Sequence, residues 1–299
     1  MALSTTRQQP PIPHPATTKW WSKDTVAIVT GANKGIGYAL VKQFAKLGLT
    51  VVLTARDWSK GLEAMDSLKA LGLDHNVSFC QLDISDRASI SSFVSWFRSR
   101  FELFDILVNN AAVSFNAMGE NSIDYADTVI KTNYYGSKQF TEAMLPHFRL
   151  LNSMARVLNI SSRLGTLDKL KNRKIKAILG DIERLSEDKI ETVVSVFLQD
   201  VAEGRWKTAG WPEIWTDYSV SKIALNAYSQ VLARRYEGVM SVNCFCPGFT
   251  QTTMTDGNGN HSADDAAEMA AAIALLPPWC LTTGKFYAGS TARGMISKL

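Results

Sequence analysis

Short apolar runs alternate with helical patterns along most of this sequence, and this alternation is what most restricts its fold. The runs are rich in β-branched residues and are bounded by segments with the apolar spacing of helices. Strands and helices that alternate in this way form a parallel sheet with helices on both faces, so we expect a doubly wound α/β fold. The expected strands are 26–30, 50–54, 77–82, 106–109, 156–160, 239–246 and 284–287, and the expected helices are 36–47, 60–70, 88–101, 140–151 and 218–236.

The chain is longer than this fold requires. It has 299 residues, whereas an α/β domain with a nucleotide site closes in about 250. Residues 1–24 are rich in Pro, Thr and Gln and lack the apolar core of a secretory signal, so we expect a flexible extension, with an organelle transit peptide as the alternative. Trp20-Trp21 is expected to pack the end of this extension against the body, and 25–299 to form one domain.

Charge and cysteine content exclude several classes of protein. The 32 basic and 28 acidic residues leave a net charge of +4, whereas nucleic-acid and membrane-surface partners require clustered basic charge. No apolar run approaches the roughly 20 residues of a membrane helix. The four Cys and four His lack the spacing of metal ligands, so no metal site is expected. Free buried thiols fit a reducing compartment, and we expect a cytoplasmic protein.

A glycine-rich turn lies between the first expected strand and the first expected helix. It reads Thr30-Gly31-Ala32-Asn33-Lys34-Gly35-Ile36-Gly37. Glycines let a backbone turn tightly and approach a pyrophosphate, which the N-terminus of the next helix attracts. The spacing G-x-x-x-G-x-G differs from the general dinucleotide fingerprint, so an ordinary strand-to-helix turn remains an alternative.

The residue after the second strand distinguishes between the two nicotinamide dinucleotides. An acid at this place binds the ribose 2′-OH, and an Arg accommodates a 2′-phosphate. Arg56 stands here and Lys34 adds a second positive charge, so we expect NADP(H), with two solvated surface charges as the competing interpretation. Asp57 also lies about 20 residues past the glycines, and we expect it to point away or to steady Arg56.

Tyr218 and Lys222 begin a helical pattern and are four residues apart, so they share a helix face. A free phenol has a pKa near about 10 and is a poor acid or base at neutral pH. A neighbouring ammonium favours the phenolate, so we expect Lys222 to lower the pKa of Tyr218 as general acid–base catalysis requires. Tyr-x-x-x-Lys alone is a weak signal, because the pair is common by chance.

Together these motifs resemble the short-chain dehydrogenase/reductase family over residues 25–286. Asn109-Asn110-Ala111-Ala112 is similar to the N-N-A-G motif of the family, with Ala112 in place of Gly, for which we expect a small shift of the cofactor. The further matches are Asn133, the strand end Asn159-Ile160-Ser161-Ser162, the pair Tyr218 and Lys222, and Pro247-Gly248 with Thr252. Six motifs in the family's order imply a single Rossmann-type domain that binds NADP(H).

The resemblance also implies roles. Tyr218 is the proton donor to a carbonyl oxygen, or the base in the reverse direction, and Lys222 binds the nicotinamide ribose. Ser162, with Ser161 as its competitor, hydrogen-bonds the substrate oxygen, and Asn133 helps to hold a water relay. The residues implied to contact the cofactor are Gly31, Asn33, Lys34, Gly35, Ile36, Gly37, Arg56, Asp83, Ile84, Asn110, Ala111, Tyr218, Lys222, Pro247, Gly248 and Thr252.

An insertion separates two of the matching motifs. Ser162 and Tyr218 have 55 residues between them, about forty more than common members of the family. This resembles the plant monomeric branch, with its carbonyl reductase-like, menthone, neomenthol and salutaridine reductase-type enzymes. We expect 167–215 to form a helical lid, with an amphipathic helix over 181–200. The insertion should cover the face that supports oligomerisation in other members, and so favour a monomer.

The expected substrate is a small apolar carbonyl compound or the matching alcohol. Aromatic and Met side chains could line an apolar pocket, although each could equally belong to the core. The leading expectation is an NADPH-dependent oxidoreductase of a terpenoid- or alkaloid-like ketone or aldehyde. The alternatives are a reductase of a conjugated C=C bond and a non-catalytic NADP-binding protein. The candidate pocket residues are Trp206, Trp211, Trp215, Phe115, Met118, Tyr135, Phe249 and Met254.

Overall fold

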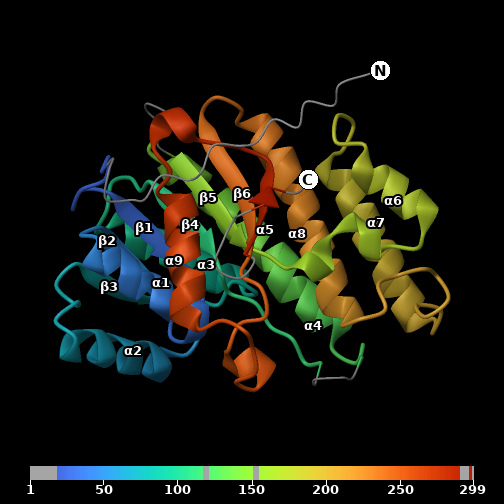
Figure 1. The fold of residues 1–299 in the computed structure, drawn as a ribbon, viewed down its shortest axis with the longest axis horizontal. Coiled ribbons are helices and arrows are strands. Elements are labelled where there is room, and N and C mark those ends of the chain that lie inside the picture. The colour runs from blue at the N-terminus through green and yellow to red at the C-terminus, as the bar shows by residue number, and fades with distance from the viewer. Residues whose placement is uncertain (1–18, 117–120, 151–154, 290–295, 298–299) are drawn as a thin grey trace.

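An eight-stranded sheet in the order β3-β2-β1-β4-β5-β6-β7-β8 forms the centre of the molecule. The computed structural model describes residues 19–116, 121–150, 155–289 and 296–297 (Figure 1). All seven expected strands are confirmed and pair in parallel, and an eighth, antiparallel strand that was not expected follows them. The strands are β1 Val26–Val29, β2 Thr50–Ala55, β3 Val77–Gln81, β4 Ile106–Asn109, β5 Ala155–Ile160, β6 Met240–Cys246, β7 Lys285–Ala288 and β8 Ile296–Ser297.

Helices cover both faces of the sheet (Figure 1). Side chains alternate between the faces along a strand, so Ile28 joins the apolar core beneath α3, α4, α5, α7 and α8, while Ala27 and Val29 join the core beneath α1, α2 and α9. The expected doubly wound architecture is confirmed. The helices are α1 Gly35–Lys46, α2 Trp58–Ala70, α3 Arg87–Arg98, α4 Ala126–Ile130, α5 Ser137–Met144, α6 Arg173–Gly180, α7 Glu187–Ala202, α8 Thr216–Arg235 and α9 Ala263–Ala274.

The expected helix 140–151 is wrong in its position. The helical segment begins earlier, with α4, a π-helical stretch over Lys131–Gly136 and then α5, which ends at Met144. Pro146 follows in a short 3-10 turn, because proline cannot continue an α-helical hydrogen-bond ladder. Phe148 then pairs with Phe104 beside the sheet. The helices α4, α6 and α9 were not expected from the sequence.

The inserted segment is helical, as expected, although its main helix α7 begins at Glu187 and not at 181. Ser186 caps it by accepting a hydrogen bond from the Lys189 N–H. The apolar face of α7 packs against α8 and α4, and ionic contacts join the insertion to the domain. Lys138 of α5 lies 2.8 Å from Glu187 and 2.6 Å from Glu191.

The described start of the chain is fastened to the domain, as expected of Trp20-Trp21. Trp21 is buried, and its indole N–H donates to the Leu47 carbonyl. Trp20 donates to the Leu275 carbonyl, and the guanidinium of buried Arg156 lies 3.6 Å from its ring centroid. Residues 1–18, and with them the expectation of a flexible extension, lie outside the described residues.

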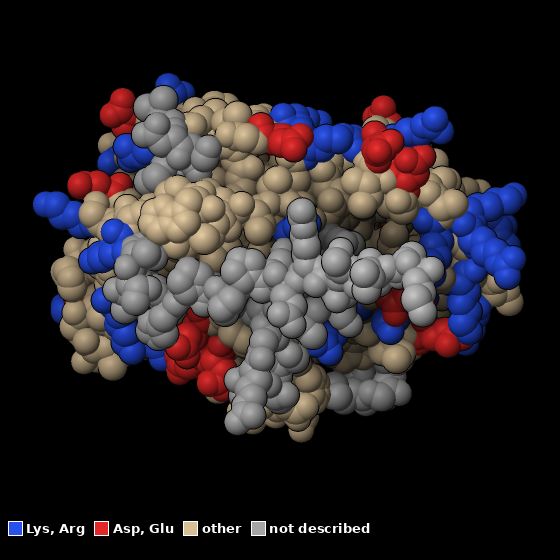
Figure 2. All heavy atoms as spheres, turned by 45° about the horizontal axis from the view of Figure 1, so that its top comes forward, with Lys and Arg blue, Asp and Glu red and all other residues tan. Residues whose placement is uncertain are grey.

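Figure 2 shows one face of the molecule, on which acidic and basic side chains are intermixed around a broad uncharged area. Among the helices that the structure describes, none combines the length and the apolar character that a membrane crossing would require.

The packing of α7 generates a stability prediction. Phe197 is fully buried and meets Trp211 edge to face at 5.1 Å between ring centroids. Because Phe197→Ala removes a buried ring and leaves a cavity, we expect a loss of about 3–5 kcal/mol in the free energy of unfolding, measured by urea denaturation. Val196→Ala on the 40% exposed side of the same helix is the matched control, with an expected change within about 0.5 kcal/mol. Equal losses in both variants would contradict this packing.

Candidate active site

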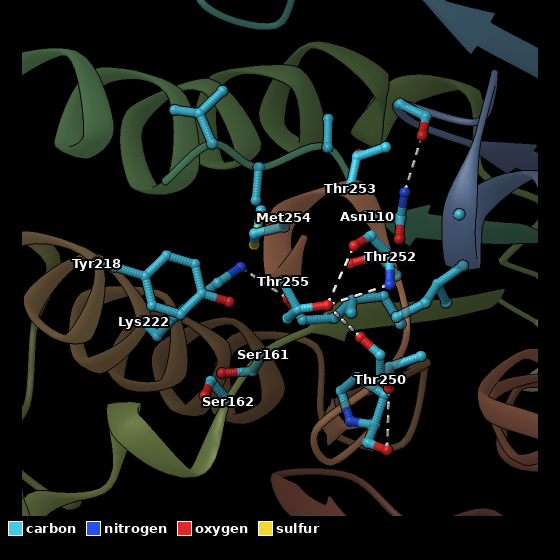
Figure 3. A pocket seen from close by; sticks show the side chains of 18 of the residues that line it. Asn110, Ser161, Ser162, Tyr218, Lys222, Thr250, Thr252, Thr253, Met254 and Thr255 are labelled. Carbon is cyan, nitrogen blue, oxygen red and sulfur yellow. Dashed lines mark hydrogen bonds between the residues drawn. The ribbon is translucent and has the colours of Figure 1, made fainter. Parts of the chain in front are cut away.

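A cavity of about 590 Å³ opens at the carboxyl ends of β1 and β4, where the order of the strands reverses direction. Ligands of open α/β sheets bind at this point. All of the candidate catalytic and cofactor-binding residues line the cavity except Gly37 and Asn133. Segments that are far apart in the sequence are therefore brought together as the motifs predict (Figure 3).

The glycines of the turn after β1 allow close contact between backbones. Gly31 has a left-handed φ of 59°, and a Cβ atom built there would lie 2.8 Å from the Ala111 Cα. Gly37 lies in the first turn of α1, and a Cβ atom there would lie 2.5 Å from the Asn110 Nδ2. Gly37 is not part of the cavity wall. Its lack of a side chain instead allows the first turn of α1 to pack against the side chain of Asn110.

The N-terminus of α1 is open to an anion. Lys34 is the N-cap residue, no side chain caps the helix, and its first turn contains no acidic residue. The backbone N–H groups and the positive end of the helix dipole are thus available to a phosphate group. Gly35 lines the cavity at this point and has a left-handed φ of 56°.

Two basic side chains lie in the wall of the cavity. Lys34 and Arg56 are both exposed and both line it. Asp57 does not line it, because its carboxylate caps α2 by accepting a hydrogen bond from the Lys60 N–H at 3.0 Å. The expectation that Asp57 points away is confirmed, because its carboxylate is directed to the N-terminus of α2.

Asn110 and Asp83 are held in place by local hydrogen bonds. The Asn110 side chain donates to the carbonyls of Thr30 and Gly31, at 2.9 and 3.0 Å, and so fixes the glycine turn. One carboxylate oxygen of Asp83 accepts from the backbone and the hydroxyl of Ser85, at 2.9 and 2.7 Å. Both residues therefore present fixed polar groups to the cavity.

Tyr218 and Lys222 project from α8 into the cavity, as their spacing predicts (Figure 3). Both are buried, and the Lys222 ammonium lies 5.4 Å from the centroid of the Tyr218 ring. Lys222 donates to the Ile160 carbonyl at 2.9 Å, which ties it to the end of β5. The helix face that carries this pair thus meets the strand end that carries the two serines.

Burial dominates the protonation of this pair. It raises the pKa of the Tyr218 phenol well above its ordinary value, and the nearby Cys246 adds to this effect. It lowers the pKa of Lys222 to about 8, against smaller opposing effects of Cys244 and Cys246. The expectation that Lys222 lowers the pKa of Tyr218 is therefore corrected, because desolvation of the phenolate shifts this pKa in the opposite direction.

The two candidate serines differ in their hydrogen bonds. The Ser161 hydroxyl donates to the Asn226 side chain at 2.6 Å. The Ser162 oxygen accepts from the Leu164 N–H at 3.1 Å, which leaves its hydroxyl proton for another acceptor. Both line the cavity, and the hydrogen bonds favour Ser162 over Ser161 as the donor to a substrate oxygen.

Asn133 lies behind the cavity and not in its wall. It is in the π-helical stretch, a local widening that is common at functional sites. Its side chain accepts from the Val113 N–H at 2.8 Å and donates to the Val113 carbonyl at 2.9 Å and to the Ser221 hydroxyl at 3.1 Å. Asn133 therefore joins the loop after β4 to the helix that carries Tyr218 and Lys222.

The candidate pocket residues divide into two groups. Trp215, Phe249 and Met254 line the cavity, whereas the other described candidates do not. Trp211 belongs to the core, where its indole N–H donates to buried Asp200 at 2.9 Å. Of the segment 167–215, which we expected to form a lid, only the last residue, Trp215, lines the cavity. The candidates outside the wall are Trp206 and Tyr135, which pack against the core, Phe115, which is 47% exposed, and Met118, which lies outside the described residues.

Sequence reasoning missed several residues of the wall, among them Arg163, Leu164 and Cys246. Arg163 and Leu164 follow Ser162 and Cys246 precedes Pro247, so their closeness to motif residues in the sequence was the available signal. Where the structure describes the chain, it contains no group of three or more His, Cys, Asp and Glu side chains that could hold a metal ion.

Known proteins share this sequence and this fold. Residues 25–175 match the short chain dehydrogenase family. Salutaridine reductase of Papaver bracteatum is 40% identical over 288 residues, which cover 86% of this chain and 92% of that protein. (+)-Neomenthol dehydrogenase of Capsicum annuum is 37% identical over 289 residues, with 84% and 91% covered. Carbonyl reductase (NADPH) 1 of Bos taurus is 33% identical over 265 residues, with 86% and 92% covered.

The fold gives the same result. The solved structure of salutaridine reductase from Papaver somniferum has a TM-score of 0.81 and 38% sequence identity, and the match covers 88% of this chain and 99% of that chain. Since both sequence and fold match over most of its length, this chain belongs to the short-chain dehydrogenase/reductase family.

Proposed function

We propose that this protein is an NADP(H)-dependent oxidoreductase that interconverts an apolar ketone or aldehyde and the corresponding alcohol. The observation that carries the proposal is one cavity that holds both a phosphate-binding helix N-terminus and the group of Ser162, Tyr218 and Lys222. The relatives named above include a carbonyl reductase that uses NADPH. Two others are named after their compounds, the alkaloid salutaridine and the terpenoid neomenthol.

The residues of the cavity fit NADP(H). Gly31 and Gly35 leave room for a pyrophosphate beside the uncapped N-terminus of α1, and Lys34 and Arg56 supply positive charge for a 2′-phosphate. Lys222 is placed to hold the nicotinamide ribose. The nicotinamide supplies the hydride, and the protein supplies position and electrostatics.

Tyr218 supplies the proton in the direction of reduction. Because burial raises its pKa, the phenol stays protonated at neutral pH and can donate to the oxygen of a carbonyl group. Ser162 donates a second hydrogen bond to the same oxygen and stabilises the negative charge that develops there. Asn133 acts as a positioning residue through Val113 and Ser221.

Two alternatives and two further expectations complete the proposal. A reductase of a conjugated C=C bond would use the same cofactor, but the Tyr218–Ser162 pair favours proton delivery to an oxygen. A non-catalytic NADP-binding protein would have no need of Ser162 and Tyr218, which are assigned to the substrate oxygen. The packing of α7 over α8 supports a monomer, because it covers a face of α8 that could otherwise meet a second copy. A cytoplasmic location remains a prediction.

The role of Tyr218 is tested by removing its hydroxyl group. We expect Tyr218→Phe to lower the rate of carbonyl reduction by about a thousandfold or more. The hydroxyl group both donates the proton and orients the substrate oxygen, and the variant loses both contributions. NADPH affinity should stay within twofold, because the ring remains. NADPH oxidation is followed by absorbance with a panel of cyclic terpenoid ketones, and the product is identified as an alcohol or a saturated ketone. Undiminished turnover in this variant would refute the role of Tyr218.

The cofactor preference is tested at Arg56. We expect Arg56→Ala to weaken NADPH binding about tenfold or more, since one charged hydrogen bond to a phosphate is worth about 1.5–3 kcal/mol. NADH binding should change little, because it lacks the 2′-phosphate. Titration calorimetry measures both, with Lys60→Ala as the control for an exposed charge outside the cavity. Equal losses for the two cofactors would contradict the 2′-phosphate site.

The pKa of Lys222 predicts a pH dependence. Since it lies at about 8, Lys222 carries its positive charge below that pH and loses it above. We therefore expect kcat/KM for NADPH to fall as pH rises through about 8, because this parameter reports groups of the free enzyme. A profile that stays flat up to pH 10, with the fold intact by circular dichroism, would show that the charge of Lys222 is not required.

A further inference from the structure

The residue before α8 has an unusual backbone conformation. Trp215 has φ 45° and ψ 59°, in the left-handed region, where bulky side chains are strained. Of the non-glycine residues that the structure describes, only Trp215 and Asp256 have a positive φ. Backbone strain of this kind persists only where surrounding contacts hold it, so the contacts around Trp215 need an explanation.

Asn121 holds this conformation from a different part of the chain. It lies in the segment between β4 and α4, and its side chain accepts from the Thr216 N–H at 2.8 Å and donates to the Glu213 carbonyl at 2.9 Å. It therefore spans the two residues between them, Ile214 and Trp215. Ser219 adds to this hold, since its N–H donates to the Trp215 carbonyl at 2.7 Å.

The strained turn places an indole ring in the wall of the cavity. The ring of Trp215 meets that of Tyr218 edge to face, at 5.9 Å between centroids and an angle of 89°. Trp215 is also the residue through which the insertion reaches the cavity, because α6 and α7 do not line it. A rigid, flat, apolar surface thus stands at right angles to the ring of the proposed proton donor.

We propose that Trp215 selects the substrate by stacking against an apolar ring that bears the carbonyl group, and that Asn121 is the positioning residue that holds Trp215 for this. The inference rests on the proposed function and names its substrate class, ring ketones over small open-chain ketones. A flat indole buries a large area of a ring, whereas a small open-chain ketone leaves most of the indole uncovered. Apolar pocket contacts of this size discriminate between substrates by factors of roughly 10 to 200.

The test compares 2-decalone, a fused-ring ketone, with 2-butanone. Trp215→Gly removes the indole and relaxes the backbone, because glycine adopts the left-handed conformation freely. Trp215→Phe keeps a flat ring. Trp279→Gly is the matched control, since Trp279 is 70% exposed and does not line the cavity. The affinity of the NADP⁺-loaded protein for each ketone is measured by calorimetry, and kcat/KM is measured with NADPH.

We expect Trp215→Gly to lose at least tenfold in affinity and in kcat/KM for 2-decalone, and less than threefold in kcat/KM for 2-butanone. Trp215→Phe should retain most of the preference, and NADPH affinity should stay within twofold throughout. Undiminished affinity of Trp215→Gly for 2-decalone, equal losses for both ketones, or no binding of 2-decalone to the wild type would overturn the inference. Binding that depends on Trp215 without any turnover in the wild type would instead refute the proposed function.

The role of Asn121 is tested by coupling. We expect Asn121→Ala to lose about threefold or more in affinity for 2-decalone, and to have no further effect when Trp215 is already Gly, because two residues that act as one unit are not additive. Asn76→Ala is the control, since the Asn76 side chain also donates to backbone carbonyls, but to those of Ala45 and Leu49, which do not line the cavity. Additive losses in the double variant would show that Asn121 does not act through Trp215.

Discussion

The burial of α8 on nearly all sides is the constraint on which the rest of the structure depends. This helix lies between the sheet and the helices α4 and α7, and most of its residues are shielded from water. A helix in this place can hold reactive side chains in fixed positions, because polar contacts tie it to its neighbours. Asn226 joins it to Ser161 and to the Gly165 carbonyl, and Ser221 joins it to Asn133. The same burial sets the protonation of Tyr218 and Lys222.

The insertion completes this enclosure. Without α7 one side of α8 would be open. Val193, Val194 and Phe197 of α7 cover that side, since they belong to the same apolar core as the residues of α8. Lys138, Glu187 and Glu191 add a network of charges at the edge of this packing. The inserted segment therefore mainly supports α8, the helix that carries Tyr218 and Lys222. Only the turn that returns to α8 reaches the cavity.

Much of the fold and of the site was predictable from the sequence, because local patterns carry them. The strands follow from apolar runs, and the glycine turn and Tyr218–Lys222 follow from spacing. The limits have physical causes. The helix before Pro146 was misplaced, since its π-helical widening has no sequence signature. The pKa of Tyr218 moves opposite to expectation, because desolvation depends on burial that only the packed structure reveals. Trp215 could not be separated from Trp206 and Trp211 by composition, because all three have the same chemistry.

The bridge from Asn121 to Trp215 joins two segments that lie more than ninety residues apart in the sequence, with separations of 92 and 95 residues between the bonded positions. The conformation of the turn at Trp215 therefore depends on both segments. Exchange of the insertion alone with that of a relative would bring in a turn without the side chain that holds it, while exchange of the loop after β4 alone would remove the support of a turn left behind. Chimeras that aim to move substrate preference between family members would have to transfer both segments together.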